Sequence, residues 1–132
     1  MVDIILVDTS SLLGHEEVIE SNLNSRLVKL KSKGFYKPII VDSSSLVILD
    51  GHHKWTAAKE IGLSRVPVVI VDYLDDESIS VDVWPDSGRS SIKKHEVIEM
   101  GLSEGLFPPK TSKHTFGFNI PSIRIPLEEL LS

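Results

Sequence analysis

The sequence predicts an α/β (α+β) fold, a mixed sheet with helices packed around it, and four features lead to this prediction. Short β-branched runs bounded by turn residues recur along the chain. Residues 66–73, apolar on both faces, should form a central strand. A strand also passes directly into a helix at residues 50–53. Apolar residues recur at helical spacing at Ile19, Leu23, Leu27 and Leu30.

The composition limits the size and the class of the protein. A chain of 132 residues with 41% hydrophobic residues can bury one core, and we expect a single compact domain over residues 1–132. The absence of cysteine excludes disulfides and thiolate metal centres. The first residues do not resemble a leader peptide, and no apolar run is as long as a membrane span. We therefore expect a cytoplasmic protein with no membrane contact.

The charge balance argues against a nucleic-acid partner. Nineteen acidic residues stand against 14 basic ones, which gives a formal net charge of −5. Proteins that bind nucleic acid usually carry a basic excess on one face, because phosphate contacts dominate their affinity. We therefore expect no nucleic acid to bind.

The first third of the chain should contain one strand and one helix. Residues 3–7 have the composition of a strand, which should end at the following serines. A helix should begin after Gly14, with Glu16 and Glu17 in its first turn, and it should end at Gly34. Acidic residues at a helix N-terminus interact favourably with the helix dipole whatever the function. Position alone therefore does not make either glutamate catalytic.

Residues 37–42 and 46–49 should form a hairpin through a turn of three serines. The second strand reaches Asp50 and Gly51, and the helix that follows should end at Gly62. At such a turn the first amides of the helix lack intrahelical partners, and they carry the positive end of its dipole. Glycine lets a ligand approach the backbone closely. The turn is therefore a candidate anion site, although a polar glycine turn without a ligand would show the same pattern.

The side chains at this turn suit phosphate. His52, His53 and Lys54 add hydrogen-bond donors and positive charge next to the free amides. Asp50 places one carboxylate beside them. That carboxylate could orient a hydroxyl or help to hold a metal ion.

The last third of the chain should contain a strand over residues 79–84, which ends at Trp84, and a helix from residue 92 to residue 100. Ser90 or Ser91 should cap this helix, and Gly101 should end it. Residues 110–114 form a stretch rich in donors that neither a helix nor a strand explains, so we expect a loop. It could bind phosphate or carboxylate, or simply be solvated. A short strand and a helical turn opened by Pro126 should complete the chain.

Four separated motifs resemble a known family. They are Gly14-His-Glu16, Asp50-Gly-His-His-Lys-Trp55, the strand ending at Trp84 and Pro109-Lys-Thr-Ser-Lys-His114. Together they resemble the ParB/sulfiredoxin-like fold and, within it, the archaeal free L-serine kinases, which make O-phosphoserine for cysteine biosynthesis. The resemblance implies a kinase that uses L-serine and a nucleotide, ADP or ATP, with Mg²⁺.

The resemblance also implies roles for the matching residues. Glu16 would be the general base, and Asp50 a second catalytic residue. Gly51, His52, His53 and Lys54 would bind the nucleotide phosphates, and Trp84, Ser112 and His114 would bind the serine. The chain departs from the family at Lys54 and Lys113, where arginine is usual, at Ser112, where threonine is usual, and in lacking an insertion after the Trp84 strand. Because lysine cannot form the bidentate fork of arginine, a different phosphate affinity or nucleotide preference is compatible with these departures. The missing insertion leaves the donor open, since members of the family use either ADP or ATP.

Three alternatives compete with a serine kinase. A ParB-like module would use the same turn to bind a nucleotide or DNA without kinase activity, although no helix-turn-helix is evident. A sulfiredoxin-like phosphotransferase would require a cysteine in the turn, and the chain has none. A nucleotide sensor would bind without catalysis. The sequence leaves open the acceptor, the metal ligands and the oligomeric state.

Overall fold

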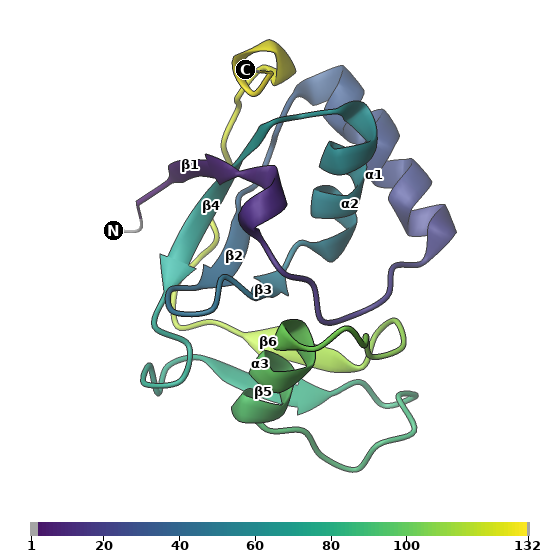
Figure 1. The fold of residues 1–132 in the computed structure, drawn as a ribbon, viewed down its shortest axis with the longest axis vertical. Helices are drawn as coiled ribbons and strands as arrows, with labels where there is room; N and C mark the ends of the chain where they lie inside the picture. Colours follow the sequence, from purple (N-terminus) through teal and green to yellow (C-terminus); the bar gives the residue numbers. More distant parts are fainter. Residues whose placement is uncertain (1–2, 132) are drawn as a thin grey trace.

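A four-stranded mixed sheet forms the centre of the fold in the computed structural model, which describes residues 3–131 (Figure 1). Its strands lie in the order β1-β4-β2-β3. Strand β4 is antiparallel to β1 and parallel to β2, and β2 is antiparallel to β3. The prediction of a central strand is confirmed, because β4 has a neighbour on each side. The strands are β1 (Ile5–Asp8), β2 (Ile39–Asp42), β3 (Ile48–Asp50) and β4 (Arg65–Val71).

Two helices, α1 (Glu20–Lys33) and α2 (His52–Ile61), cover one face of this sheet (Figure 1). Leu23 and Leu30 of α1 and the two alanines of α2 pack there against strand residues such as Ile39. Gly34 and Gly62 end the two helices, as the sequence predicted. The apolar spacing in α1 therefore faces the sheet.

The other face of the sheet packs against a smaller layer. It consists of a two-stranded antiparallel sheet, β5 (Ser80–Val83) with β6 (Ser112–Thr115), and of helix α3 (Lys94–Leu102). Successive residues of β2 are buried on opposite faces: Ile39 joins the core under α1 and α2, and Ile40 joins the core near α3. This two-sided burial explains why the strands are apolar throughout.

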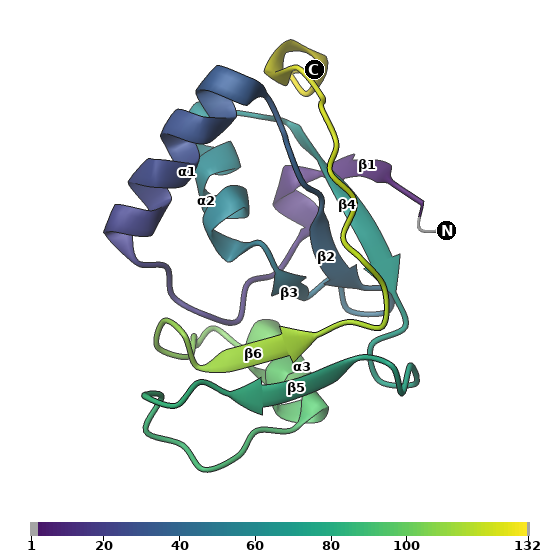
Figure 2. The same cartoon turned by 180° about the vertical axis from the view of Figure 1, so that it is seen from behind.

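The C-terminal segment runs back along the central sheet (Figure 2). Ile125 pairs with Phe35 in an isolated antiparallel bridge, and the chain then forms the short 3-10 turn η2 (Leu127–Glu129) after Pro126. The predicted terminal turn is therefore confirmed. Within residues 3–131, no helix combines the length and the apolar character needed to cross a membrane.

The segment before α1 corrects one prediction. We expected Glu16 and Glu17 in the first turn of a helix, but α1 begins at Glu20 and both residues precede it. The segment is extended, because its backbone pairs elsewhere. The amide of Phe107 donates to the carbonyl of His15 and the amide of Glu17 donates to the carbonyl of Phe107, each at 2.8 Å. Glu16 is therefore held by partners from a distant part of the chain.

Two further predictions need correction. Residues 112–115, which we expected in a loop, form strand β6 and pair with β5. Helix α3 begins at Lys94 instead of residue 92, and neither predicted serine caps it. Instead, the Glu96 carboxylate accepts the amide of the N-cap residue Lys93 at 2.9 Å. The helix also continues one residue beyond Gly101.

Candidate functional site

The turn between β3 and α2 requires a glycine. Gly51 has a φ of 110°, in the left-handed region, and a Cβ there would lie 3.1 Å from Cγ1 of Ile39. The amide of Trp55 donates to the Gly51 carbonyl at 2.9 Å, so the three amides before Trp55 precede the first such bond. Those amides and the positive end of the helix dipole form an anion-binding geometry.

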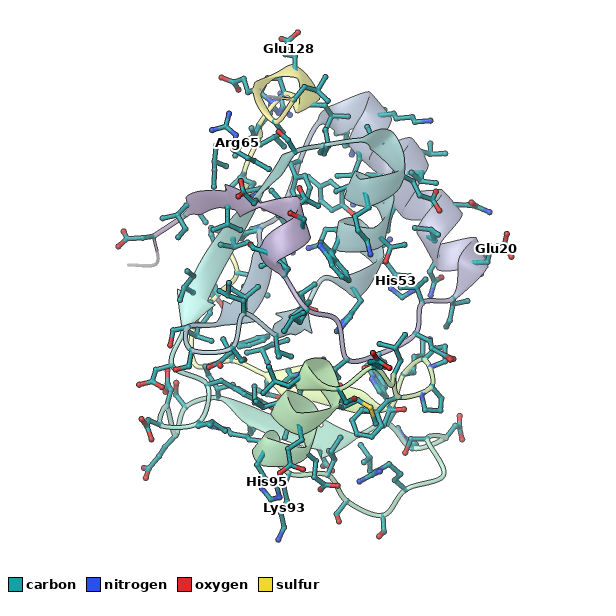
Figure 3. The ribbon with its side chains drawn as sticks, viewed as in Figure 1. Glu20, His53, Arg65, Lys93, His95 and Glu128 are labelled. Atoms are coloured by element: carbon teal, nitrogen blue, oxygen red, sulfur yellow. The ribbon has the colours of Figure 1, made fainter. Side chains whose placement is uncertain are left out.

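The two histidines of the turn have a defined tautomer. Nε2 of His52 accepts the backbone amide of His15 at 3.1 Å, and Nε2 of His53 accepts that of Ile19 at 2.9 Å. Because an amide can only donate, neither Nε2 carries a proton, and the neutral rings are protonated at Nδ1. Burial lowers the pKa of both rings, most strongly that of His52. Figure 3 shows His53 at the start of α2, beside the segment that leads to α1.

A basic cavity of 280 Å³ opens at this turn. Lys54 lies on its wall and is buried, and burial lowers its pKa to about 8 although Asp50 opposes that shift. Tyr36 also lines it, and the Tyr36 hydroxyl is the only buried side-chain polar atom without a hydrogen-bond partner in the described part of the chain. The remaining cationic side chains are Arg26, Lys29 and Lys37. Cations and free donors at a helix N-terminus are the chemistry that binds phosphates.

A second cavity of 250 Å³ is lined by the same turn. It shares Arg26 and residues 50–53 with the basic cavity, and the residues that it adds include Glu16, Glu17, Trp84, Lys110 and Ser112. The turn therefore forms a wall common to both cavities. A ligand in one cavity and a ligand in the other would therefore be neighbours at this turn.

Glu16 is held by two hydrogen bonds in the second cavity. Its Oε1 accepts the amide of Thr111 at 2.7 Å, and its Oε2 accepts the hydroxyl of Ser112 at 2.8 Å. Burial raises the pKa of Glu16, and these hydrogen bonds oppose that shift. The neighbouring Glu17 is exposed to solvent. Of these two neighbours, Glu16 therefore presents the fixed, partly desolvated carboxylate, the kind of group that acts as a general base.

His15 is a residue of this site that the sequence did not assign. It is fully buried; its Nδ1 lies 2.8 Å from the Ile48 carbonyl, and its Nε2 lies 2.9 Å from Oγ of Ser112. Burial lowers its pKa to about 4, so its Nε2, 3.6 Å from Oε2 of Glu16, forms no ion pair near neutral pH. The one available signal was its place between Gly14 and Glu16 in the first motif.

Trp84 and His114 have different positions. The Trp84 indole donates to the Ser112 carbonyl at 3.1 Å and lies on the wall of the second cavity. His114 lines neither cavity; its Nε2 lies 2.8 Å from the hydroxyl of Tyr73, and burial lowers its pKa to about 3. All the predicted site residues except His114 thus line one or both cavities in the described part of the chain.

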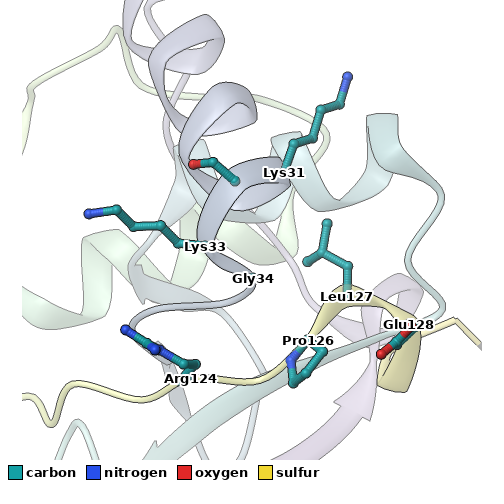
Figure 4. A pocket seen from close by; sticks show the side chains of 8 residues that line it. Lys31, Lys33, Gly34, Arg124, Pro126, Leu127 and Glu128 are labelled. Carbon is teal, nitrogen blue, oxygen red and sulfur yellow. The ribbon is translucent and has the colours of Figure 1, made fainter.

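A larger hollow of 620 Å³ lies at the other end of α1, against the C-terminal segment (Figure 4). Lys31, Lys33 and Arg124 line it, which at first suggests an anion site. However, the end of α1 exposes carbonyl groups and the negative end of the helix dipole, both of which disfavour an anion. The cavities at the Gly51 turn are therefore the better candidates.

Comparison with known proteins gives two kinds of curated relative. An ATP-dependent L-serine kinase from Staphylothermus marinus is 37% identical over 80% of this chain and 42% of its own length. An ADP-dependent L-serine kinase from Thermococcus kodakarensis is 28% identical over 80% of the chain and 44% of its own length. The chain thus spans less than half the length of these kinases. A ParB-like protein from Sulfolobus acidocaldarius is 30% identical over 92% of the chain and 95% of its own length.

The fold matches a solved free serine kinase in complex with AMP, with a TM-score of 0.89 and 18% identity over 98% of this chain and 94% of that one. At that identity the likeness concerns the fold. The family model of the ParB N-terminal domain matches residues 4–84, which include the β3–α2 turn and both helices on its face of the sheet. The chain belongs to the ParB N-terminal domain family.

Proposed function

We propose that this protein is a small-molecule kinase that transfers a phosphoryl group from ADP or ATP to the hydroxyl of free L-serine, giving O-phosphoserine. The observation that carries the proposal is the pair of cavities that meet at the Gly51 turn, with Glu16 on the wall of only one of them. The names of the two curated kinase relatives support the same reaction and both donors. O-Phosphoserine then fits the cysteine biosynthesis that the resemblance implies.

We assign the nucleotide phosphates to the basic cavity. The amides at the start of α2 and the Nδ1–H groups of His52 and His53 supply neutral donors, and Lys54 supplies a charge. Phosphoryl transfer needs little covalent participation by the protein, and catalysis depends on positioning and on compensating negative charge. These groups meet that need at the end of the nucleotide that reacts.

Mg²⁺ fits this arrangement. Residues 3–131 contain no cluster of three or more acidic or histidine side chains that could form a metal cage of their own. Mg²⁺ does not require one, since it is commonly held by one or two carboxylates together with substrate phosphates. Asp50 is the one carboxylate on the wall of the basic cavity and would be its protein ligand. The bound ion would offset negative charge on the phosphates.

We assign L-serine to the second cavity, with Trp84 and Ser112 on its wall. His114 lies two residues beyond Ser112 on β6, lines neither cavity, and contacts the hydroxyl of Tyr73. The acceptor O–H bond breaks and its proton goes to Glu16, while the oxygen forms a bond to phosphorus. The bond between that phosphorus and the leaving nucleotide oxygen breaks in the same step. A positioned carboxylate base contributes on the order of 10²–10⁴-fold to such a rate.

The test is direct. The protein is incubated with Mg²⁺, L-serine and either ADP or ATP, and phosphoserine is measured by mass spectrometry. Formation of phosphoserine with at least one nucleotide supports the proposal, and the ratio of the two rates assigns the donor. Both substrates are metabolites of the cytoplasm, so the proposal places the enzyme there. No phosphoserine with either nucleotide, from protein shown to be folded, contradicts it.

A second candidate is a ParB-like module that binds a nucleotide without transferring phosphate. The family match and the Sulfolobus relative of nearly equal length favour this alternative. It predicts nucleotide binding by calorimetry, no phosphoserine, and little effect of Glu16→Gln on that binding, because Glu16 does not line the basic cavity. The kinase predicts turnover that depends on Glu16.

A further inference from the structure

Ser112 stands between two groups that both require its single proton. Its Oγ lies 2.8 Å from Oε2 of Glu16 and 2.9 Å from Nε2 of His15. The other nitrogen of His15 lies 2.8 Å from the carbonyl of Ile48, which can only accept, so Nδ1 carries the proton of the neutral ring. When Glu16 is ionised and His15 is neutral, one of the two contacts of Ser112 therefore has no proton.

One additional proton completes both contacts. Protonated Glu16 donates from Oε2 to Ser112, and the Ser112 hydroxyl then turns and donates to Nε2 of His15. Burial lowers the pKa of His15 to about 4 and raises that of Glu16, so the additional proton rests on the carboxyl and not on the imidazole. The chain from Ile48 to Glu16 is thus fully hydrogen-bonded only after Glu16 has accepted a proton.

We propose that His15 is a positioning residue that makes Glu16 a stronger base, acting through the Ser112 hydroxyl. The proposal rests on the proposed function, in which Glu16 takes the proton of the serine hydroxyl. Before transfer, the Ser112 hydroxyl can donate its proton either to the Glu16 carboxylate or to Nε2 of His15, but not to both. After transfer, the proton from the substrate stays on Glu16 and the Ser112 proton serves His15. His15 itself is fully buried and lines neither cavity.

The other charged and titratable groups around this chain do not compete for the Ser112 proton. The rings of His52 and His114 lie 4.5 Å and 6.1 Å from that of His15, and burial lowers the pKa of both. The cavity wall adds Glu17, Arg26, Asp50, His53 and Lys110. Within residues 3–131, none of these groups hydrogen-bonds to Nε2 of His15 or to Oε2 of Glu16.

A matched pair of variants separates the acceptor on residue 15 from its bulk. His15→Leu removes the acceptor and keeps an apolar side chain, whereas His15→Gln keeps an amide oxygen that can accept from Ser112. The pKa of the Glu16 carboxyl is measured by ¹³C NMR in the whole protein without substrates. In His15→Leu it should fall by about one unit, because the Ser112 proton then serves the carboxylate alone. In His15→Gln it should stay close to that of the native protein.

The kinetic arm uses the pH profile of phosphoserine formation. In His15→Leu the acidic limb of kcat should move to lower pH by the same amount, and the plateau should fall about ten-fold because a weaker base accepts the proton less readily. His15→Gln should restore both. If His15→Leu does not fold, His15→Asn replaces it, since the shorter amide can bond to Ile48 but cannot reach Ser112.

The two arms distinguish the two proposals. A lower Glu16 pKa in His15→Leu, with no phosphoserine from the native protein, supports the role of His15 in setting that pKa and overturns the proposed kinase. An unchanged Glu16 pKa overturns the role of His15, even if the variant is less active. A profile that moves in His15→Leu and not in His15→Gln supports both.

Discussion

The hydroxyl of Ser112 donates to the carboxylate of Glu16 across 96 positions of sequence. The bond joins the extended segment before α1 to strand β6, and so it links the central sheet to the smaller layer. The Thr111 amide holds the other carboxylate oxygen. Ser112 and the residue before it therefore fix the orientation of the Glu16 carboxylate, as a positioned base requires.

Replacing Glu16 with glutamine tests the base. Glutamine keeps the size of the side chain and can still accept from Thr111, but it cannot take a proton. We expect kcat for phosphoserine formation to fall by about 10²–10⁴-fold. Nucleotide affinity, measured by calorimetry, should change little, because Glu16 does not line the basic cavity.

Glu17 provides the control for this experiment. It is adjacent in sequence and carries the same charge, but its side chain is exposed. Glu17→Gln should therefore change kcat by less than about three-fold, as expected for a surface substitution. A larger loss for Glu17 than for Glu16 would move the base to Glu17, and no loss in either variant would leave Asp50 as the remaining candidate.

The Gly51 turn should be intolerant of a side chain. In Gly51→Ala the residue keeps a φ of 110°, and its Cβ meets Ile39 at 3.1 Å. The left-handed conformation costs roughly 1–2 kcal/mol, and the crowding adds roughly 1–3 kcal/mol. Gly62→Ala is the matched control at the other end of α2, with a φ of 90° and no atom within 4 Å of its Cβ. Urea denaturation should show a clearly larger loss for Gly51→Ala, and equal losses would remove the argument from crowding.

The parts of the fold that the sequence predicts are those whose signals are local. Strand β4 is apolar on both faces because both faces are buried, and Gly51 and Gly62 mark the ends of α2 through their own backbone conformations. The start of α1 is different. Acidic residues after Gly14 are equally compatible with a helix start and with an extended segment. The choice is made by Phe107, whose backbone pairs with that segment.

The same reasoning explains which features of the site could not be predicted from the sequence. Ser112 and His114 face inward from β6, and two polar inward residues do not produce the apolar alternation of a strand. Their partners, His15 and Tyr73, are far away in sequence. A buried histidine such as His15 is recognisable only when its partners at both nitrogens are known.

Lys54 should make nucleotide affinity depend on pH. Burial lowers its pKa to about 8, so the charge that attracts phosphate is lost as the pH rises through that value. Affinity measured by calorimetry should fall roughly ten-fold between about pH 7 and 9 as the charged fraction falls. Lys54→Met should bind more weakly at pH 7 and lose this dependence, whereas Lys59→Met, at an exposed position of the same helix, should keep it.

The stability of the nucleotide-free protein tests the lowered pKa of Lys54 independently. Stability should rise with pH, whereas nucleotide affinity falls. The folded pKa of about 8 lies below the ordinary value of 10.5, so the unfolded chain binds more protons between these values. Lys54 therefore contributes stability that increases as the pH rises from about 8 towards 10.5. Comparing the pH dependence of unfolding in the native protein and in Lys54→Met isolates this contribution. A difference that stays constant over that range would show that the pKa of Lys54 is not lowered in the folded state.

Lys110 combines a strained backbone with a charge at the second cavity. Its φ is 56°, in the left-handed region, and its ammonium belongs to the cavity that contains Glu16. Asparagine tolerates this conformation better than lysine or alanine does. Lys110→Asn should therefore be more stable to urea than Lys110→Ala by roughly 0.5–1 kcal/mol.

Both variants lose the ammonium, and both should lower kcat/KM for serine about ten-fold if that charge pairs with an anionic group of the substrates. Equal stability of the two variants would argue against strain at this position. Unchanged kinetics in both would restrict the role of Lys110 to placing the Thr111 amide against Glu16.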